Sequence, residues 1–213
     1  MCGIAGIINF NKTFDNSLVK KMLKAMEYRG PDSFQQSSGN FYQIGMVRLS
    51  IVDLSKNAEQ PFYDEKNKVK VIYNGEIYNF LSLKEKYLKD INFKSNCDGE
   101  IIPYLYSKFG LDFINLLDGM FSICLIDEKN NKVILIRDRF GIKPLYFHYN
   151  KNTKELTFSS EIPPIFYNKK IQKMENFHET NRYLNLGQVN TTDETWFKDI
   201  YQVSPGGYLK FEK

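Results

Sequence analysis

The fold is decided at the N-terminus, which reads Met1-Cys2-Gly3-Ile4-Ala5-Gly6-Ile7-Ile8-Asn9-Phe10. The apolar run from Gly3 to Phe10, followed by the polar Asn11 and Lys12, predicts a buried strand that runs into a turn. Cys2 then projects from the start of a central strand. A free cysteine is often a small buried hydrophobe, and these residues alone leave that interpretation open beside a catalytic one.

A catalytic role for Cys2 depends on removal of Met1, which makes Cys2 the first residue of the chain. The thiol and a free α-amine then belong to the same residue. A free α-amine has an ordinary pKa of about 7.7–8.0, so it can act near neutral pH as the base that activates the thiol. This pairing is one form of nucleophilic catalysis, in which the amine takes the part that histidine plays elsewhere.

The composition favours one large domain. The chain has 213 residues, of which 42% are hydrophobic, and this is enough for a sizeable core. The net charge of +4 is spread over the sequence without the basic runs, interleaved with aromatic residues, that a nucleic-acid surface needs. No run approaches the roughly 20 apolar residues of a membrane span, and the apolar start has no basic leader. The sequence therefore predicts neither a nucleic-acid nor a membrane partner.

The cysteines and histidines argue against a metal or disulfide scaffold. Cys2, Cys97 and Cys124 are odd in number and far apart, so neither a disulfide framework nor a paired-cysteine metal site is expected. A reducing cytoplasm is the simplest location. Neither His148 nor His178 has a partner at ligand spacing, so no metal is predicted for this domain.

The pattern along the first half of the chain mixes strands and helices. Helical spacing of apolar residues from Leu18 to Met26, with Ser17 as the cap, predicts a first helix that stops at Gly30-Pro31. Arg29-Gly30-Pro31-Asp32 is a turn by composition, since glycine tolerates positive φ. Strands are predicted over residues 45–52, 69–73, 120–126, 133–136, 144–149 and 155–158, the last four as two hairpins.

Two polar segments are predicted to lead into helices. Asn74-Gly75-Glu76-Ile77-Tyr78-Asn79 carries a hairpin signal, but Asn79 can cap a helix, so we expect a strand-to-helix loop. Asp98 can cap a further helix, in which Pro103 predicts a kink or a late start. After Glu161 the chain is broken by Pro163-Pro164 and turns polar, and order is expected only at residues 183–184 and 203–211.

Five motifs occur in order along the chain. They are Met1-Cys2-Gly3-Ile4-Ala5-Gly6, Arg29-Gly30-Pro31-Asp32, Arg48-Leu49-Ser50-Ile51-Val52-Asp53, Asn74-Gly75-Glu76-Ile77-Tyr78-Asn79 and Arg137-Asp138-Arg139-Phe140-Gly141-Ile142-Lys143-Pro144-Leu145-Tyr146, with Phe158-Ser159-Ser160-Glu161-Ile162 and Ser204-Pro205-Gly206-Gly207 after them. Together they resemble the class II (N-terminal-nucleophile) glutamine amidotransferase domain of glutamine-hydrolysing asparagine synthetase or a close relative. The resemblance covers essentially the whole chain.

The resemblance implies an α+β fold of the N-terminal-nucleophile hydrolases, a four-layer αββα sandwich of two antiparallel sheets. It implies that glutamine is hydrolysed to glutamate and that the ammonia passes to an ATP-dependent synthetase domain, most simply for amidation of aspartate to asparagine. Residues 1–213 then form the glutaminase domain at the start of a longer chain. No cofactor is expected in this domain, since ATP and Mg belong to the synthetase domain that follows in cis, and a homodimer is left open.

The resemblance also assigns roles. Cys2 is the nucleophile, and the Asn74 side-chain amide and the Gly75 backbone N–H bind the tetrahedral oxyanion. Arg48 holds the α-carboxylate of glutamine in a bidentate manner, while Asp98, with Glu76 nearby, holds its α-ammonium. The other substrate-binding residues implied are Leu49, Ser50, Ile51, Val52 and Gly99. Without the resemblance, Arg48 reads as a surface ion pair and Asp98 as a helix cap.

Three positions depart from the family pattern. Met46 stands where a histidine is usual, two residues before the binding arginine, which removes a polar contact. Gly99 replaces a hydroxyl or thiol residue, so only its backbone can contribute. Pro163-Pro164 replaces a helix-friendly pair, which puts the local helix in doubt.

Two other functions remain open at this stage. The same glutaminase chemistry can serve a different acceptor, such as a carboxylate on a surface sugar, because the acceptor site lies outside these residues. A binding or regulatory module without turnover is the alternative from another class, and the intact set of Cys2, Arg48, Asn74, Gly75, Glu76 and Asp98 argues against it.

Overall fold

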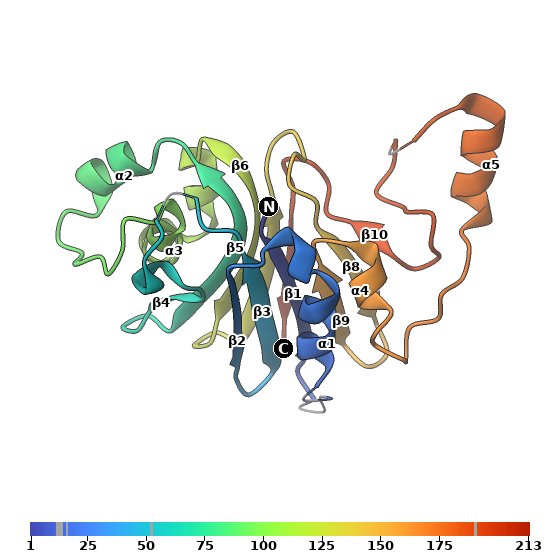
Figure 1. The fold of residues 1–213 in the computed structure, drawn as a ribbon, viewed down its shortest axis with the longest axis horizontal. Helices are drawn as coiled ribbons and strands as arrows, with labels where there is room; N and C mark the ends of the chain where they lie inside the picture. The colour runs from blue at the N-terminus through green and yellow to red at the C-terminus, as the bar shows by residue number, and fades with distance from the viewer. Residues whose placement is uncertain (12–14, 16, 52, 190) are drawn as a thin grey trace.

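The computed structural model describes residues 1–11, 15, 17–51, 53–189 and 191–213 and places them in four layers (Figure 1). Two antiparallel sheets stack face to face, and helices cover their outer faces. The predicted α+β architecture, a four-layer αββα sandwich of two antiparallel sheets, is therefore confirmed.

The first sheet has the strand order β10-β8-β9-β1-β3-β2. Its strands are β1 (Gly3–Asn9), β2 (Ser33–Ser38), β3 (Tyr42–Arg48), β8 (Tyr146–Asn150), β9 (Glu155–Ser159) and β10 (Tyr201–Gln202). β1 pairs with β3 on one side and β9 on the other, with Gly3 opposite Val47 and Ala5 opposite Ser159. The first strand is central, as predicted, and Cys2 lies directly before it.

The second sheet has the order β11-β7-β6-β5-β4. Its strands are β4 (Phe62–Asp64), β5 (Val69–Ile77), β6 (Gly119–Asp127), β7 (Lys132–Arg137) and β11 (Tyr208–Glu212). β6 pairs with β7 and β8 with β9, so both predicted hairpins are confirmed. Three strands were not predicted from the sequence: β2, the three-residue β4 and the two-residue β10.

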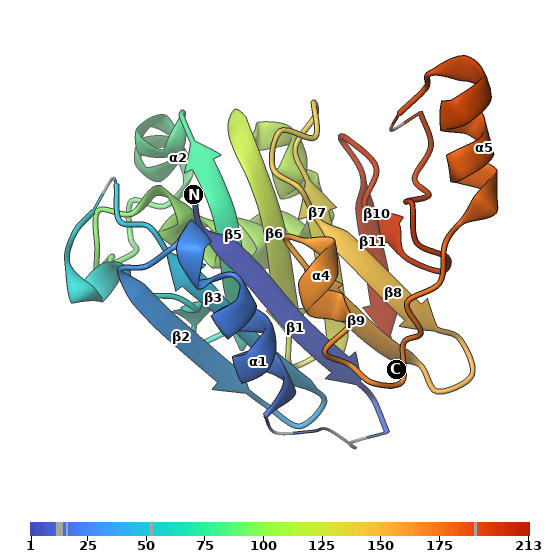
Figure 2. The ribbon, with the colours of Figure 1, turned by 45° about the vertical axis from the view of Figure 1, so that its right-hand side comes forward.

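The helices are α1 (Leu18–Ala25), α2 (Phe80–Tyr87), α3 (Ile102–Phe109), α4 (Ile162–Ile165) and α5 (Phe177–Leu186), with 3-10 segments η1 (Glu27–Arg29), η2 (Lys56–Ala58), η3 (Asp98–Ile101) and η4 (Gly110–Leu116). α1 packs on the outer face of the first sheet, and α2 and α3 pack on that of the second. Figure 2 shows α4 on the same face as α1, and α5 standing away from both sheets. None of the helices in the described ranges is long and apolar enough to cross a membrane.

Strand β5 corrects one prediction, because it runs through Asn74, Gly75 and Glu76 to Ile77. These residues were expected in a strand-to-helix loop. Asn74 lies opposite Ser122 and Gly75 opposite Phe121, so the pairing with β6 continues the strand past the Asn-Gly signal. Long-range pairing of this kind is not visible in a local turn pattern.

The helix beginnings also differ from the sequence interpretation. The turn before α3 is a 3-10 segment, and the helix starts late at Ile102 with Pro103 in its first turn, as predicted. Asp98, however, caps no helix, because its carboxylate binds other groups described below. Ser17 precedes α1 but makes no capping hydrogen bond from its side chain.

The turn before β2 and the end of β3 need two further corrections. Gly30 has φ −148°, so it is not there for positive φ. A Cβ on Gly30 would come within 2.6 Å of the Arg48 backbone, and close approach to β3 is therefore what requires glycine. β3 ends at Arg48 rather than at Val52, which lies outside the described residues, as does Lys12 of the predicted first turn.

The chain after Glu161 is more ordered than its composition suggested. Pro163 and Pro164 occupy the first turn of α4, where the missing N–H costs no hydrogen bond. α5 follows, capped by the Asn176 side chain, which accepts a hydrogen bond from the His178 N–H. The proline pair had put the local helix in doubt, and the structure shows a short helix there because the pair stands at its start.

Candidate active site

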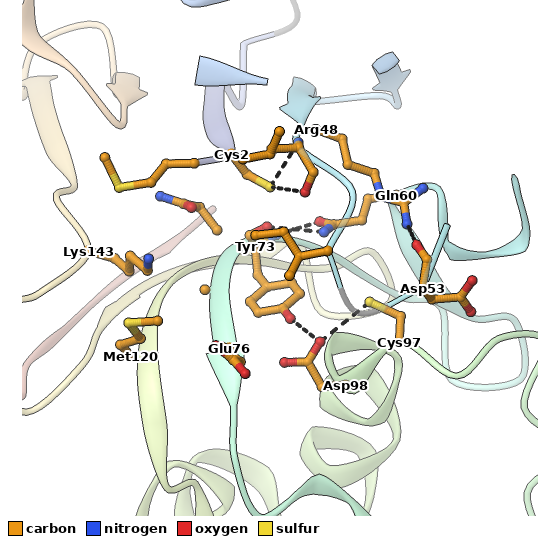
Figure 3. A pocket seen from close by; sticks show the side chains of 15 residues that line it. Cys2, Arg48, Asp53, Gln60, Tyr73, Glu76, Cys97, Asp98, Met120 and Lys143 are labelled. Atoms are coloured by element: carbon orange, nitrogen blue, oxygen red, sulfur yellow. Dashed lines mark hydrogen bonds between the residues drawn. The ribbon is translucent and has the colours of Figure 1, made fainter. Parts of the chain in front are cut away.

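A cavity of about 180 Å³ opens beside the start of β1, between the two sheets (Figure 3). Most of the site residues implied by the resemblance line it: Cys2, Arg48, Leu49, Ile51, Asn74, Gly75, Glu76 and Asp98. Ser50 and Gly99 do not line it, and Val52 lies outside the described residues. The structure thus brings together residues that are up to 96 positions apart in the sequence, from Cys2 to Asp98.

The start of β1 holds Cys2 at the mouth of this cavity. Because Gly3 pairs with Val47, Cys2 lies next to the end of β3. The Leu49 N–H donates to Cys2 Sγ at 3.4 Å, and Arg29 Nε donates to the Cys2 carbonyl oxygen at 3.0 Å. Cys2 is half-buried, and its thiol makes only long, weak contacts with the Leu49 backbone. The sulfur is therefore held in place while remaining available to a ligand.

Strand β5 presents Asn74 to the cavity by its alternation. Side chains two residues apart share one face of a strand, and Ile72 packs into the core between the sheets, so Asn74 faces the first sheet. Asn74 is 1% exposed, and its Nδ2 has no hydrogen-bond partner among the described residues. A buried donor without a partner destabilises the folded state by about 1–3 kcal/mol. Such a donor at the wall of a cavity indicates a group that binds a ligand there.

The Gly75 backbone lies beside Asn74. A Cβ at this position would come within 2.3 Å of the Met120 carbonyl oxygen on β6. Only glycine therefore allows β5 and β6 to approach this closely while the peptide borders the cavity.

Just before Asn74, Gln60 clamps the backbone of β5. The Tyr73 N–H donates to Gln60 Oε1 at 2.6 Å, and Gln60 Nε2 donates to the Tyr73 carbonyl at 3.1 Å. Gln60 is buried, and both ends of its amide are used. The clamp fixes the strand that carries Asn74, and this role of Gln60 was not predicted from the sequence.

Arg48 is buried at the end of β3 and is already engaged. Its Nη1 donates to the Ser55 carbonyl at 3.2 Å, and its Nη2 donates to the Asp53 carbonyl. Ser50, in the same segment, is held by its N–H bond of 2.7 Å to Asp32 Oδ2. Arg48 thus shapes the loop over the cavity and borders the cavity at once.

Asp98 lies at the end of the cavity away from Cys2, and its carboxylate is bound on both oxygens. Tyr73 donates its hydroxyl to Oδ1, and the Ile77 N–H donates to Oδ2 at 2.6 Å. Figure 3 shows Asp98 beneath the Tyr73 ring, with Glu76 close by. Burial and the Asp98 charge raise the pKa of Tyr73 well above its ordinary value, so the phenol remains a donor.

The Tyr73 ring also explains Gly99. A Cβ on Gly99 would come within 2.0 Å of the ring, so the tyrosine occupies the space of a side chain at position 99. The substrate contact of Gly99 stays a prediction, and in the structure the Tyr73 ring lies beside this glycine. Neither Tyr73 nor this steric relation was anticipated, because the two residues are 26 positions apart.

The remaining cysteines are poor nucleophiles. Cys97 lines the cavity, but burial and the Asp98 charge raise its pKa to about 12. Cys124 is buried between the sheets, and burial raises its pKa well above the ordinary value. Met46, at the position of the usual histidine, is also part of that core. Cys2 is therefore the cysteine best placed for chemistry.

One cluster near α5 has side chains of the metal-ligand type. His178 Nδ1 lies 3.7 Å from Glu179 Oε1 and 3.6 Å from Glu194 Oε2. The prediction that His178 has no partner at ligand spacing missed these two carboxylates. Arg182 pairs with Glu179 at 3.2 Å, and Asn176 donates to Glu194 at 2.9 Å. Both carboxylates are engaged, so the cluster ties α5 to the segment that follows it.

Comparison with known proteins gives matches over the whole chain. Residues 1–213 match a family described as glutamine amidotransferase domain. The chain is 38% identical over 218 residues to asparagine synthetase [glutamine-hydrolyzing] 2 of Bacillus subtilis. This alignment covers 99% of this chain and 29% of that protein. It is 33% identical over 224 residues to amidase chry2 of Gibberella zeae, covering 98% and 32% of the two chains. The chain thus spans about a third of the length of these relatives.

A solved structure supports the fold. Glutamine phosphoribosylpyrophosphate amidotransferase from B. subtilis superimposes with a TM-score of 0.65 at 16% identity. The similarity covers 78% of this chain and 43% of the other.

Proposed function

Because the chain belongs to the family of glutamine amidotransferase domains, we propose that it hydrolyses the side-chain amide of glutamine in the cavity that Cys2 lines. The observation that carries this proposal is the Asn74 amide. Its Nδ2 is buried and without a partner among the described residues, and it borders the same cavity as the Cys2 sulfur. A nucleophile and a free donor that border one cavity form the minimal arrangement for acyl transfer.

The first half of the reaction forms a thioester. After removal of Met1, the Cys2 α-amine takes the thiol proton, and Sγ attacks the carboxamide carbon of glutamine. Asn74 Nδ2 and the Gly75 N–H bind the oxygen as it becomes negative. The intermediate collapses, the carbon–nitrogen bond breaks, and the protonated amine gives its proton to the leaving ammonia.

The second half releases glutamate. A water gives a proton to the α-amine and attacks the thioester carbon, and the same two donors bind the oxyanion. The carbon–sulfur bond then breaks, and the proton returns to sulfur. The chemistry consumes one water per glutamine and needs no cofactor from this domain.

The other end of the cavity fits the α-carbon of glutamine. Arg48 offers a cation to the α-carboxylate, and Asp98 and Glu76 offer anions to the α-ammonium. These charges lie on separate elements, β3, η3 and β5, and a zwitterion of matching polarity bridges them.

The acceptor of the ammonia lies outside this chain, and we take it to be a carboxylate that a synthetase domain in cis activates with ATP and Mg. Aspartate is the first choice, because the relative from B. subtilis is named as an asparagine synthetase. A different acceptor is the second choice, because the relative from Gibberella zeae is named as an amidase and not as an asparagine synthetase.

The test is direct. The purified chain with Met1 removed should convert glutamine to equal amounts of glutamate and ammonia, and Cys2→Ala should not. Protein that retains Met1 should be inactive, because the nitrogen of Cys2 is then an amide. Glutamate production by Cys2→Ala or by the unprocessed protein would refute the mechanism. For the acceptor, the longer protein is incubated with glutamine, Mg-ATP and aspartate, and asparagine is measured.

A further inference from the structure

Lys143 is a buried cation that the mechanism above does not use. Its side chain is 8% exposed and lines the cavity together with Cys2 and Asn74. Figure 3 shows Lys143 above Met120 on one wall, with its nitrogen turned toward the interior and with Asp98 on the far side. No hydrogen bond or ion pair to Nζ is found within the described part of the chain.

The backbone of Lys143 is held firmly, so the position of the side chain is not accidental. The Lys143 N–H donates to Asp138 Oδ2 at 2.9 Å, and the Lys143 carbonyl accepts from Arg137 Nε at 3.0 Å. Asp138 also binds the N–H groups of Phe140 and Ile142, which fixes the whole loop between β7 and β8. The loop therefore presents the lysine to the cavity as a built feature.

The Lys143 ammonium has no counter-charge at this site. Asp98 binds Tyr73 and Ile77, and Lys143 forms an ion pair with neither Asp98 nor Glu76. Because the lysine stands at the wall of a partly buried cavity, an anion that enters next to it is attracted more strongly than it would be in bulk water. The reaction proposed above makes two such anions from a neutral amide, first the tetrahedral oxyanion and then the γ-carboxylate of glutamate.

We propose that Lys143 is a further catalytic residue of this site, whose ammonium binds the carboxamide oxygen as it becomes negative and then the γ-carboxylate of the product. This inference rests on the proposed glutaminase function. Lys143 joins Asn74 Nδ2 and the Gly75 N–H, and it differs from them because its charge discriminates between the neutral substrate and the anionic states. Its contribution is therefore made in the transition state and not in the binding of glutamine.

The test compares Lys143→Met, which keeps the length of the side chain without its charge, with Lys143→Arg, which keeps the charge. Arg139→Met is the matched control, because Arg139 is an exposed cation of the same loop that does not line the cavity. For each protein we would measure kcat and KM for glutamine, inhibition by glutamate, and inhibition by the γ-aldehyde analogue of glutamine, which forms a tetrahedral adduct with a thiol.

Lys143→Met should lower kcat by about 10- to 100-fold, as expected for loss of a charged hydrogen bond, with KM within about threefold. Affinity for the aldehyde and for glutamate should fall in parallel with kcat. Lys143→Arg should recover most of the loss, and Arg139→Met should match the wild type. If Lys143→Met does not fold, Lys143→Gln gives the same readouts.

Two outcomes would overturn the proposal. One is unchanged kcat and aldehyde affinity in a folded neutral variant. The other is an equal loss of affinity for glutamine and for the aldehyde, which indicates a distorted cavity. Failure of the proposed function looks different, because the wild type itself would then make no glutamate.

Discussion

The two ends of the cavity treat their polar groups in opposite ways. At the reacting end, Asn74 Nδ2 has no partner among the described residues, and Cys2 Sγ makes only long contacts. At the far end, both oxygens of Asp98 accept hydrogen bonds, and Arg48 donates to two carbonyl oxygens. In the proposed mechanism, the unpaired groups are those that meet a developing charge, and the hydrogen-bonded groups are those that meet a charge already present on the substrate.

This difference has a physical reason. A free buried donor stabilises an oxyanion strongly because it gives up no other bond when the charge appears. A carboxylate that already has two donors still attracts an ammonium through its charge, and its fixed orientation lowers the entropy that binding costs. Substitutions at the reacting end should therefore change kcat, and substitutions at the far end should change KM.

The largest effect is expected for Cys2→Ala. The variant should have no measurable glutaminase activity, because Cys97 and Cys124 have raised pKa values and form no thiolate near neutral pH. Glutamine binding should persist, since the far end is intact, and calorimetry with glutamine measures this directly. Retained turnover would place the nucleophile elsewhere and remove the distinction between the two ends.

Asn74→Ala should come next, with kcat lowered by about 10²- to 10³-fold and KM little changed, as for the loss of one oxyanion donor. The free energy of unfolding should change little, because Nδ2 makes no hydrogen bond within the described structure that the substitution could remove. Steady-state kinetics and a thermal melt check both statements. A change in KM alone would assign Asn74 to substrate binding and contradict the comparison.

Asp98→Asn tests the far end. It keeps the shape of the side chain and removes the charge, so KM for glutamine should rise by about 10- to 100-fold, as for the loss of a charged hydrogen bond, while kcat changes little. An analogue of glutamine without the α-amine serves as the control, because its KM should not respond to this substitution. Equal responses of glutamine and this analogue would show that Asp98 does not bind the ammonium.

Gly99→Ala should act on the same end without touching the substrate. The added Cβ would come within 2.0 Å of the Tyr73 ring, which must move and carry its hydroxyl away from Asp98. We expect a loss of about 1–3 kcal/mol in the free energy of unfolding, as in other overpacked cores, and a severalfold rise in KM. Denaturant unfolding and kinetics measure the two effects, and a variant that is normal in both would show that the ring is not confined.

The sequence predicted much of this cavity but little of its support. Five residues of the cavity stand in the motifs named above: Cys2, Arg48, Asn74, Gly75 and Glu76. Asp98 stands outside them and was assigned through the family resemblance alone. The structure brings all six to one cavity. The roles of Gln60 and Tyr73 were not predicted, because they depend on contacts between residues far apart in the sequence. Gln60 binds the backbone of Tyr73, 13 positions away, and the Tyr73 ring lies against Gly99, 26 positions away. A local pattern carries no record of such contacts.

The same limit explains the errors in the fold. Asn74-Gly75 has the composition of a turn, and only its pairing with Ser122 and Phe121 makes it a strand. A Pro-Pro pair is typical of a helix end, and Pro163-Pro164 is compatible with α4 only because it occupies the first turn of that helix. Central strands and hairpins were predicted well, because burial on two sides leaves a continuous apolar run in the sequence.

The smallest effect is expected for Tyr73→Phe. The ring still fills the space beside Gly99, so stability should change by about 1 kcal/mol, the worth of one hydrogen bond. Asp98 loses the tyrosine donor on Oδ1, where only the long contact of 3.5 Å from Cys97 Sγ remains, and it keeps the Ile77 N–H on Oδ2. Its orientation should loosen, and KM for glutamine should rise by about two- to fivefold at unchanged kcat. Because the raised pKa of Tyr73 keeps the phenol protonated, this ratio should not vary between pH 6 and 9. Combining Tyr73→Phe with Asp98→Asn sharpens the result: if the tyrosine acts only through Asp98, the double variant should have the KM of Asp98→Asn alone.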